Sequence, residues 1–213
     1  MEFGKLLEIV GEEPVFETGL LLCGDVDTKD IRRQLSRWVN GGRIVQLRRG
    51  LYVLARPYRR IEPHPFVVAN RLVVPSYVSL QSALGFFGLI PEGVPATVSV
   101  TTKRPGRRST DLGEFAFRHL KVEMFSGYTR MDVGHGQKAF VATAEKALID
   151  LVHLHPKSDA PGYLAGLRLQ NMDKLDLAEL ERLAFKSSRP KLQRAVTAVR
   201  DLAEQEAGEY QPL

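Results

Sequence analysis

The chain has 213 residues, of which 44% are hydrophobic and 26% charged, with a formal net charge of +5. This is the composition of an ordinary soluble globular protein, and no apolar run approaches the roughly 18 residues needed to span a bilayer. The lone cysteine, Cys23, excludes an internal disulfide framework, and its apolar neighbours predict a buried side chain. We see no signal peptide, and we expect a cytoplasmic protein without a membrane partner.

Two helices are predicted before residue 25. Phe3, Leu6 and Val10 recur at helical spacing, which predicts an amphipathic helix over residues 3–10. Pro14 suits the first turn of a second helix, roughly residues 15–22, which Gly24 would end. Residues 24–27 are then expected to form the turn into a third helix.

The third helix is predicted over Thr28–Asn40. Asp27 or Thr28 can cap its start, and Gly41-Gly42 can end it. Its apolar face comprises Ile31, Leu35, Trp38 and Val39, and the polar and basic side chains around the rest of the helix are Lys29, Arg32, Arg33, Ser36, Arg37 and Asn40. A hairpin over residues 44–54 follows, with Arg48-Arg49-Gly50 as its tight tip.

Positive charge is concentrated in this stretch. Residues 29–60 contain ten basic side chains and one acidic side chain, a net charge of +9, so the rest of the chain carries −4. A local excess of this size is typical of a phosphate-binding face, although a solvated basic helix that binds nothing specific would have the same composition.

Residues 1–56 are therefore interpreted as a winged helix-turn-helix that binds double-stranded DNA. The helix would enter the major groove, where we expect Arg32, Arg33, Ser36 and Arg37 to reach base edges. Arg48 and Arg49 would reach the backbone or minor groove, and Lys29, Asn40 and Arg43 would reach phosphates.

Residues 57–65 are predicted to be a linker that contains Pro57, Pro63 and Pro65. Arg56, Arg59 and Arg60 lie in or beside it, where they would either extend the phosphate contacts or only keep the linker soluble.

Residues 66–213 are predicted to form a mixed α/β domain with a helical tail, which makes the whole chain an α+β protein. The pattern indicates helices near 67–72, 80–87, 144–153, 177–186 and 190–206, and strands at 97–101 and 114–120. Residues 121–125 are a candidate continuation of the second strand. Residues 138–143 suit a strand or the entry into a helix. Residues 103–110, 127–136 and 156–162 are expected to be irregular.

The basic segment at 103–110 contains Lys103, Arg104, Arg107 and Arg108. It would contact a second stretch of DNA backbone, an acidic partner or RNA, or it is a solvated loop; the sequence leaves these alternatives open.

No catalytic constellation is recognisable, so we expect a protein that is not an enzyme and needs no cofactor or metal. Glu145, Lys146 and Asp150 are expected to form ion pairs on a helix surface or between domains. Asp25-Val26-Asp27 is better explained by helix capping than by metal binding, and Gly134-His135-Gly136 by a tight turn. His153 and His155 do not share a helix face, which argues against zinc.

Several short segments resemble the AbiEi family, the antitoxins of type IV toxin–antitoxin and abortive-infection systems. The resemblance runs from about Lys5 to about His153. Beyond the predicted winged helix, the segments that carry it are Tyr77–Ser79, Ser82–Leu84, Gly88-Leu89, Val98–Thr101, Phe115–Phe117 and Ala144–Leu151.

The resemblance implies a repressor that binds inverted repeats in its own promoter, and a second domain that supplies antitoxicity. The implied partner is a nucleotidyltransferase-like toxin, which need not form a stable complex with the antitoxin. Two other classes stay open: a nucleic-acid-processing enzyme targeted by the winged helix, and a regulator whose second domain senses a small molecule.

Overall fold

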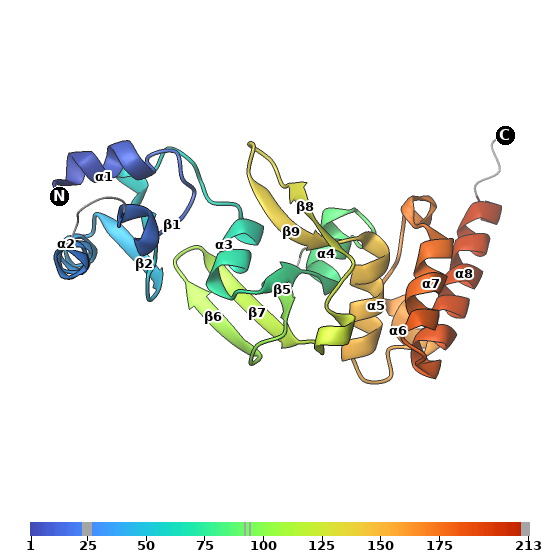
Figure 1. The fold of residues 1–213 in the computed structure, drawn as a ribbon. Coiled ribbons are helices and arrows are strands. Elements are labelled where there is room, and N and C mark those ends of the chain that lie inside the picture. The colour runs from blue at the N-terminus through green and yellow to red at the C-terminus, as the bar shows by residue number, and fades with distance from the viewer. Residues whose placement is uncertain (23–26, 92, 94, 210–213) are drawn as a thin grey trace.

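The computed structural model describes residues 1–22, 27–91, 93 and 95–209. This part of the chain contains eight α-helices and two β-sheets, which confirms the predicted α+β class. The elements follow one another along an elongated molecule, with α1 and α2 at one end and α7 and α8 at the other (Figure 1). None of the described helices is both long and apolar enough to cross a membrane.

The chain begins with an N-terminal unit, the name we use for residues 1–54. Its helices are α1 (Phe3–Val10) and α2 (Thr28–Asn40), and its strands are β1 (Phe16–Glu17), β2 (Ile44–Arg48) and β3 (Leu51–Leu54). The strands form an antiparallel sheet in the order β1-β3-β2. The predicted helices at 3–10 and 28–40 and the hairpin at 44–54 are confirmed.

Helix α2 begins and ends as its sequence predicts. The Asp27 carboxylate accepts a hydrogen bond of 2.8 Å from the backbone N–H of Lys29, which satisfies a free donor of the first turn. Asn40 is the last residue of the helix, Gly41 is its C-cap, and Gly42 takes a left-handed φ of +65° that glycine adopts without strain. Ile31, Leu35 and Trp38 are buried against the rest of the unit.

The prediction of a second α-helix over residues 15–22 is wrong. Phe16 and Glu17 form strand β1, which pairs with Tyr52 and Leu51 of β3, and a short 3₁₀ helix, η1 (Thr18–Leu21), follows. Pairing to β3 outweighs the weak local preference for helix, because it satisfies the open edge of β3 and stacks the rings of Phe16 and Tyr52 with centroids 5.7 Å apart. Cys23 and the turn predicted at 24–26 lie outside the described residues.

Strand β3 is buried on both faces. Tyr52 and Leu54 belong to the core of the N-terminal unit, together with Leu6, Ile31 and Trp38. Leu51 and Val53 point the other way and belong to a second, larger core that includes helix α3 and the central sheet. One strand therefore contributes to two cores, and the N-terminal unit is packed directly against the rest of the chain.

A mixed six-stranded sheet forms the middle of the molecule, in the order β6-β7-β5-β4-β9-β8. Its strands are β4 (Ser76–Val78), β5 (Thr97–Thr101), β6 (Gly106–Thr110), β7 (Gly113–His119), β8 (Tyr128–Asp132) and β9 (Lys138–Ala142), and its helices are α3 (Pro65–Leu72), α4 (Leu80–Phe86) and α5 (Ala144–Leu154). The pairs β4–β9 and β5–β7 are parallel and the other pairs antiparallel.

Both outermost strands of this sheet fall in segments predicted to be irregular. Residues 106–110 of the expected basic loop form β6, and residues 128–132 of the expected turn-rich stretch form β8. An edge strand needs apolar side chains on few positions, so its sequence resembles a loop, and only pairing with β7 or β9 makes it a strand. The expected continuation of a strand through 121–125 is also wrong, because a 3₁₀ helix, η3 (Val122–Met124), lies there.

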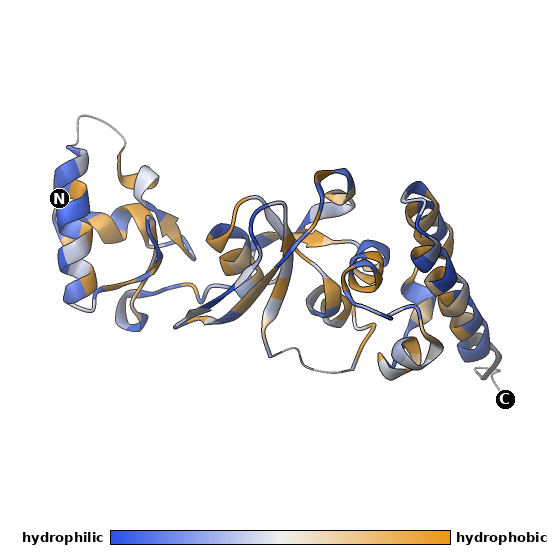
Figure 2. Ribbon diagram, turned by 90° about the horizontal axis from the view of Figure 1, so that it is seen from below, coloured by the Kyte–Doolittle hydropathy of each residue, from blue (hydrophilic) through white to orange (hydrophobic). Residues whose placement is uncertain are grey.

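The helical tail is confirmed, and it shares the larger core. It consists of α6 (Pro161–Gly166), which begins inside the predicted 156–162 loop, η4 (Met172–Lys174), α7 (Leu177–Lys186) and α8 (Pro190–Glu209). Leu192, Val196 and Val199 of α8 are buried in the core that also holds α5 and the sheet. Hydrophobic and hydrophilic residues alternate along both long tail helices (Figure 2).

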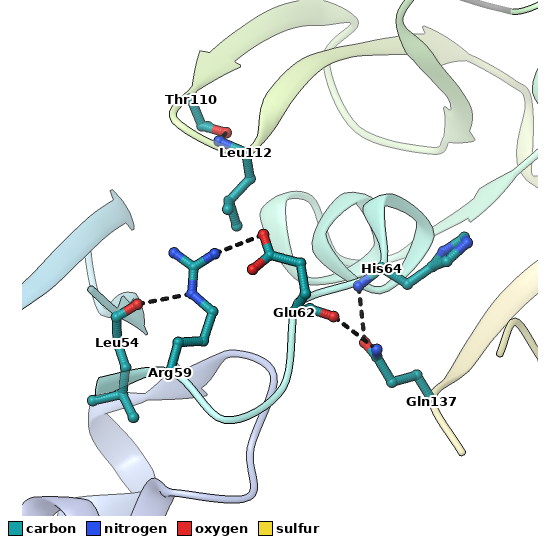
Figure 3. A network of polar contacts seen from close by, with 7 residues as sticks. All are labelled: Leu54, Arg59, Glu62, His64, Thr110, Leu112 and Gln137. Atoms are coloured by element: carbon teal, nitrogen blue, oxygen red, sulfur yellow. Dashed lines mark hydrogen bonds and ion pairs between the residues drawn. The ribbon is translucent and has the colours of Figure 1, made fainter. Parts of the chain in front are cut away.

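The predicted linker is an ordered junction. Residues Arg56–Tyr58 form a 3₁₀ helix, η2, and the Arg59 guanidinium donates to the carbonyl of Leu54 (3.0 Å) and to the Glu62 carboxylate (2.7 Å). The amide of Gln137 donates to the Glu62 carbonyl and accepts from the His64 N–H, both at 2.9 Å (Figure 3). These contacts tie residues 54–64 to the loop before β9.

We expect Arg59→Ala to loosen this junction. The Arg59 side chain is only 7% exposed, so its removal leaves the Leu54 carbonyl and the Glu62 carboxylate without their charged donor. The free energy of unfolding should fall by about 1.5–3 kcal/mol, measured by chemical denaturation.

The matched control is Arg60→Ala. Arg60 lies 3.6 Å from Glu12 with both side chains more than 70% exposed, and such a pair contributes little in water. This variant should stay within about 0.5 kcal/mol of the parent, and equal effects of the two substitutions would contradict the structural role of Arg59.

Candidate nucleic-acid interface

Six of the nine predicted DNA-binding side chains lie on α2, and all six are exposed. They are Lys29, Arg32, Arg33, Ser36, Arg37 and Asn40. Helix α2 stands at the N-terminal end of the molecule, where its ribbon is largely hydrophilic (Figure 2). Because Ile31, Leu35 and Trp38 are buried on the other side, the helix presents its basic and polar face to solvent.

Two cations on or beside this face, Arg33 and Arg43, make only weak contacts within the protein. Arg33 lies 3.5 Å from Asp30, but both side chains are more than 60% exposed, so the pair gives way to a stronger partner at little cost. The guanidinium carbon of Arg43 lies 5.0 Å from the centroid of the Phe3 ring, which packs edge-on against Trp38. Arg43 is exposed and is held near the C-terminal end of α2 by this contact.

The two arginines at the hairpin tip differ. Arg48 is half-buried, and its guanidinium donates to the carbonyl of Arg71 (3.0 Å), the carbonyl of Arg49 (3.0 Å) and the carboxylate of Glu17 (3.2 Å). Arg71 belongs to α3, so Arg48 joins the hairpin to the middle of the molecule. Arg49 is exposed beside Gly50, whose φ of +81° makes the tight tip. Only Arg49 is thus an open cation of the tip.

The second basic segment, residues 103–110, is partly irregular and partly strand β6. Lys103, Arg104, Arg107 and Arg108 are all exposed, as expected. Arg107 and Arg108 are consecutive residues of edge strand β6, so they point to opposite faces of the sheet. Arg107 lines a cavity of about 560 Å³ together with Arg118 and Glu114. Charged residues on an edge strand also prevent pairing with another sheet, which gives them a structural reason to be there.

The expectation that Glu145, Lys146 and Asp150 lie on a helix surface is wrong. All three are buried, with 8%, 3% and 0% of their surface exposed. Lys146 and Asp150 form an ion pair one turn apart on α5, and the Asp150 carboxylate also accepts from the hydroxyls of Tyr77 (2.9 Å) and Ser79 (2.8 Å). Burial raises the pKa of Asp150, while the Lys146 ammonium and the two hydroxyls act in the opposite direction.

This buried cluster has a structural explanation. Through Tyr77 of strand β4 and the adjacent Ser79, it joins α5 to the sheet. The Glu145 carboxylate accepts a hydrogen bond of 3.0 Å from the backbone N–H of Asp176, at the start of α7. Helix α5 lies between α4, the sheet and α7, so none of its faces is free for charged side chains. The partners Tyr77 and Ser79 lie more than 70 residues away in sequence, and no local signal points to them.

Histidines in the described part of the chain have separate surroundings. The His64 ring nitrogen Nδ1 accepts from the backbone N–H of Phe66 and so caps α3. His135 lies in a turn with a φ of +53°. Over the described residues, no group of three or more histidine, cysteine, aspartate or glutamate side chains is placed to hold a metal ion.

Comparison with known proteins gives no match, either to a family model or to a curated protein.

We expect Asp150→Ala to be severely destabilising, because it leaves the Lys146 ammonium buried without its counter-ion. The free energy of unfolding should fall by about 3–5 kcal/mol in chemical denaturation. The double variant Lys146→Met with Asp150→Leu removes both charges and should recover most of this loss. A loss as large in the double variant as in Asp150→Ala would contradict the ion-pair explanation.

Proposed function

We propose that the N-terminal unit is a winged helix-turn-helix and that the protein binds double-stranded DNA through it. The single observation that carries this proposal is the face of α2: six exposed polar or basic side chains above a buried apolar seam. A helix of this kind fits the major groove, and an adjoining hairpin with a cation at its tip fits the phosphate backbone or the minor groove.

We propose different roles for the side chains within this interface. Arg32, Arg33, Ser36 and Arg37 are proposed to reach base edges, and Lys29, Asn40 and Arg43 to reach phosphates. Arg49 is proposed as the contact of the hairpin tip, whereas the three hydrogen bonds of Arg48 favour a structural role for that residue.

We further propose that the protein is a repressor of its own promoter and an antitoxin of the type IV class. What supports this is the resemblance of the segments between Lys5 and His153 to AbiEi proteins, together with the DNA-binding face. The proposed operator is an inverted repeat, and the proposed partner is a nucleotidyltransferase-like toxin. In this proposal the protein acts in the cytoplasm by binding rather than by catalysis.

The double variant Arg33→Ala with Arg37→Ala tests the placement of α2. Each arginine that pairs with guanine contributes about 1–3 kcal/mol of discrimination, so affinity for the protein's own upstream region should fall at least about tenfold. Fluorescence anisotropy with that duplex and with a scrambled duplex measures both affinity and specificity.

The matched control is Lys103→Ala with Arg104→Ala, which removes the same charge from a different surface. It should leave the preference for the upstream region unchanged, and a loss equal to that of the α2 variant would contradict the proposed interface. The α2 variant should also keep toxin neutralisation when it is produced together with the toxin, since that role is proposed for the second domain.

A comparison of Arg49→Ala with Arg48→Ala tests the hairpin. Loss of a phosphate contact at Arg49 should weaken binding to all duplexes alike and reduce the slope of log affinity against log salt concentration by about 1. Arg48→Ala should instead lower the melting temperature while changing the salt slope less. A larger change of the salt slope for Arg48→Ala than for Arg49→Ala would indicate that Arg48 contacts the DNA backbone.

A further inference from the structure

A basic cavity lies far from α2, where the helical tail meets the middle of the molecule. Its volume is about 410 Å³, and its walls come from η3, α5, the end of α7 and the residue before α8. This size is within the range of roughly 300–1,000 Å³ found for small-molecule sites. None of the residues proposed to bind DNA lines it.

Four cations and one acid line this cavity. The cations are Lys121, Lys146, Lys186 and Arg189, and the acid is Glu123. Lys146 is buried and neutralised by Asp150. The other three cations have no carboxylate within 4 Å among the described residues, so with Glu123 counted the cavity has two unbalanced positive charges.

A half-buried histidine, His153, lies close to these cations. His153 follows Ile149 by one turn of α5, and its pKa is lowered to about 4, first by burial and then by Arg189, Lys146, Lys191 and Lys121. Three of these four cations line the cavity. The cavity cations therefore add to the effect of burial on this histidine.

The remaining walls suit an organic ligand rather than a bare ion. Met124, Ile149 and Leu183 supply apolar surface. The hydroxyl of Ser187 already donates to the carbonyl of Ala184, whereas no partner occupies the exposed hydroxyl of Ser126 among the described residues. The cavity thus offers positive charge, one free hydroxyl and an apolar wall within a single space.

We propose that this cavity binds a small organic phosphate of the size of a nucleoside monophosphate. A phosphate monoester carries a charge of about −1.5 to −2 at pH 7 and three acceptor oxygens, which matches two unbalanced positive charges. Lys121, Lys186 and Arg189 bind the phosphoryl oxygens, and the apolar wall covers the body of the ligand. The ligand bridges η3 and the α7–α8 turn, so in this proposal the second domain is a receptor for a small molecule.

Isothermal titration calorimetry of the full chain with AMP, inorganic phosphate and adenosine tests this proposal. AMP should bind saturably, with a dissociation constant below about 1 mM, and should bind more tightly than adenosine because the phosphoryl group is recognised. Saturating AMP should raise the melting temperature by at least about 3 °C. Inorganic phosphate binding as tightly as AMP would support the phosphate site but reassign its ligand to free phosphate.

Two variants decide whether the cavity is responsible. Lys121→Ala with Arg189→Ala should weaken AMP binding at least tenfold, and Lys186→Glu, at an exposed position of the same wall, should do the same if the first variant does not fold. Lys103→Ala with Arg104→Ala removes equal charge elsewhere and should bind AMP like the parent. Absence of saturable AMP and phosphate binding, or equal weakening by the control, would overturn the proposal whatever the outcome for DNA.

Discussion

Strand β3 is the constraint on which the arrangement of the whole molecule depends. Its four residues are all buried, and alternate side chains enter two different cores. A strand buried on both faces cannot be exposed on either side without loss of apolar contacts, at roughly 25 cal/mol per Å² of apolar surface. The N-terminal unit is therefore held against α3 and the central sheet, and it does not swing on a flexible linker.

This docking divides the basic residues of the first 60 positions into two groups. Arg48 and Arg59 turn toward the docked surfaces, where carbonyls and carboxylates occupy their guanidinium groups. The cations of α2 are exposed on another side of the N-terminal unit, where the one ion pair that the described residues of the helix form is the solvent-exposed contact of Arg33 with Asp30. A local charge of +9 in the sequence thus becomes a smaller set of exposed cations on α2, which is the surface proposed to bind DNA.

Helix α5 shows how the same residue types serve two purposes. Lys146 and Asp150 neutralise each other in the interior and, through Tyr77 and Ser79, hold the helix on the sheet. Beside that pair, Lys121, Lys186 and Arg189 form no ion pair within 4 Å among the described residues. The paired charges of Lys146 and Asp150 stabilise the fold. The cations without an ion pair, which lie next to α5 on neighbouring elements, are available for the proposed ligand.

The sequence by itself determined α1, α2, the hairpin, α5 and the two longer tail helices α7 and α8, because caps, glycine stops and apolar periodicity act within a few residues. It also determined which face of α2 is basic. Only the tertiary structure decided that residues 16–17 form a strand, that 106–110 and 128–132 complete the sheet, and that Asp150 is buried beside Tyr77. Those outcomes depend on partners far away in the chain, so neither local propensity nor charge pattern contains the information that selects them.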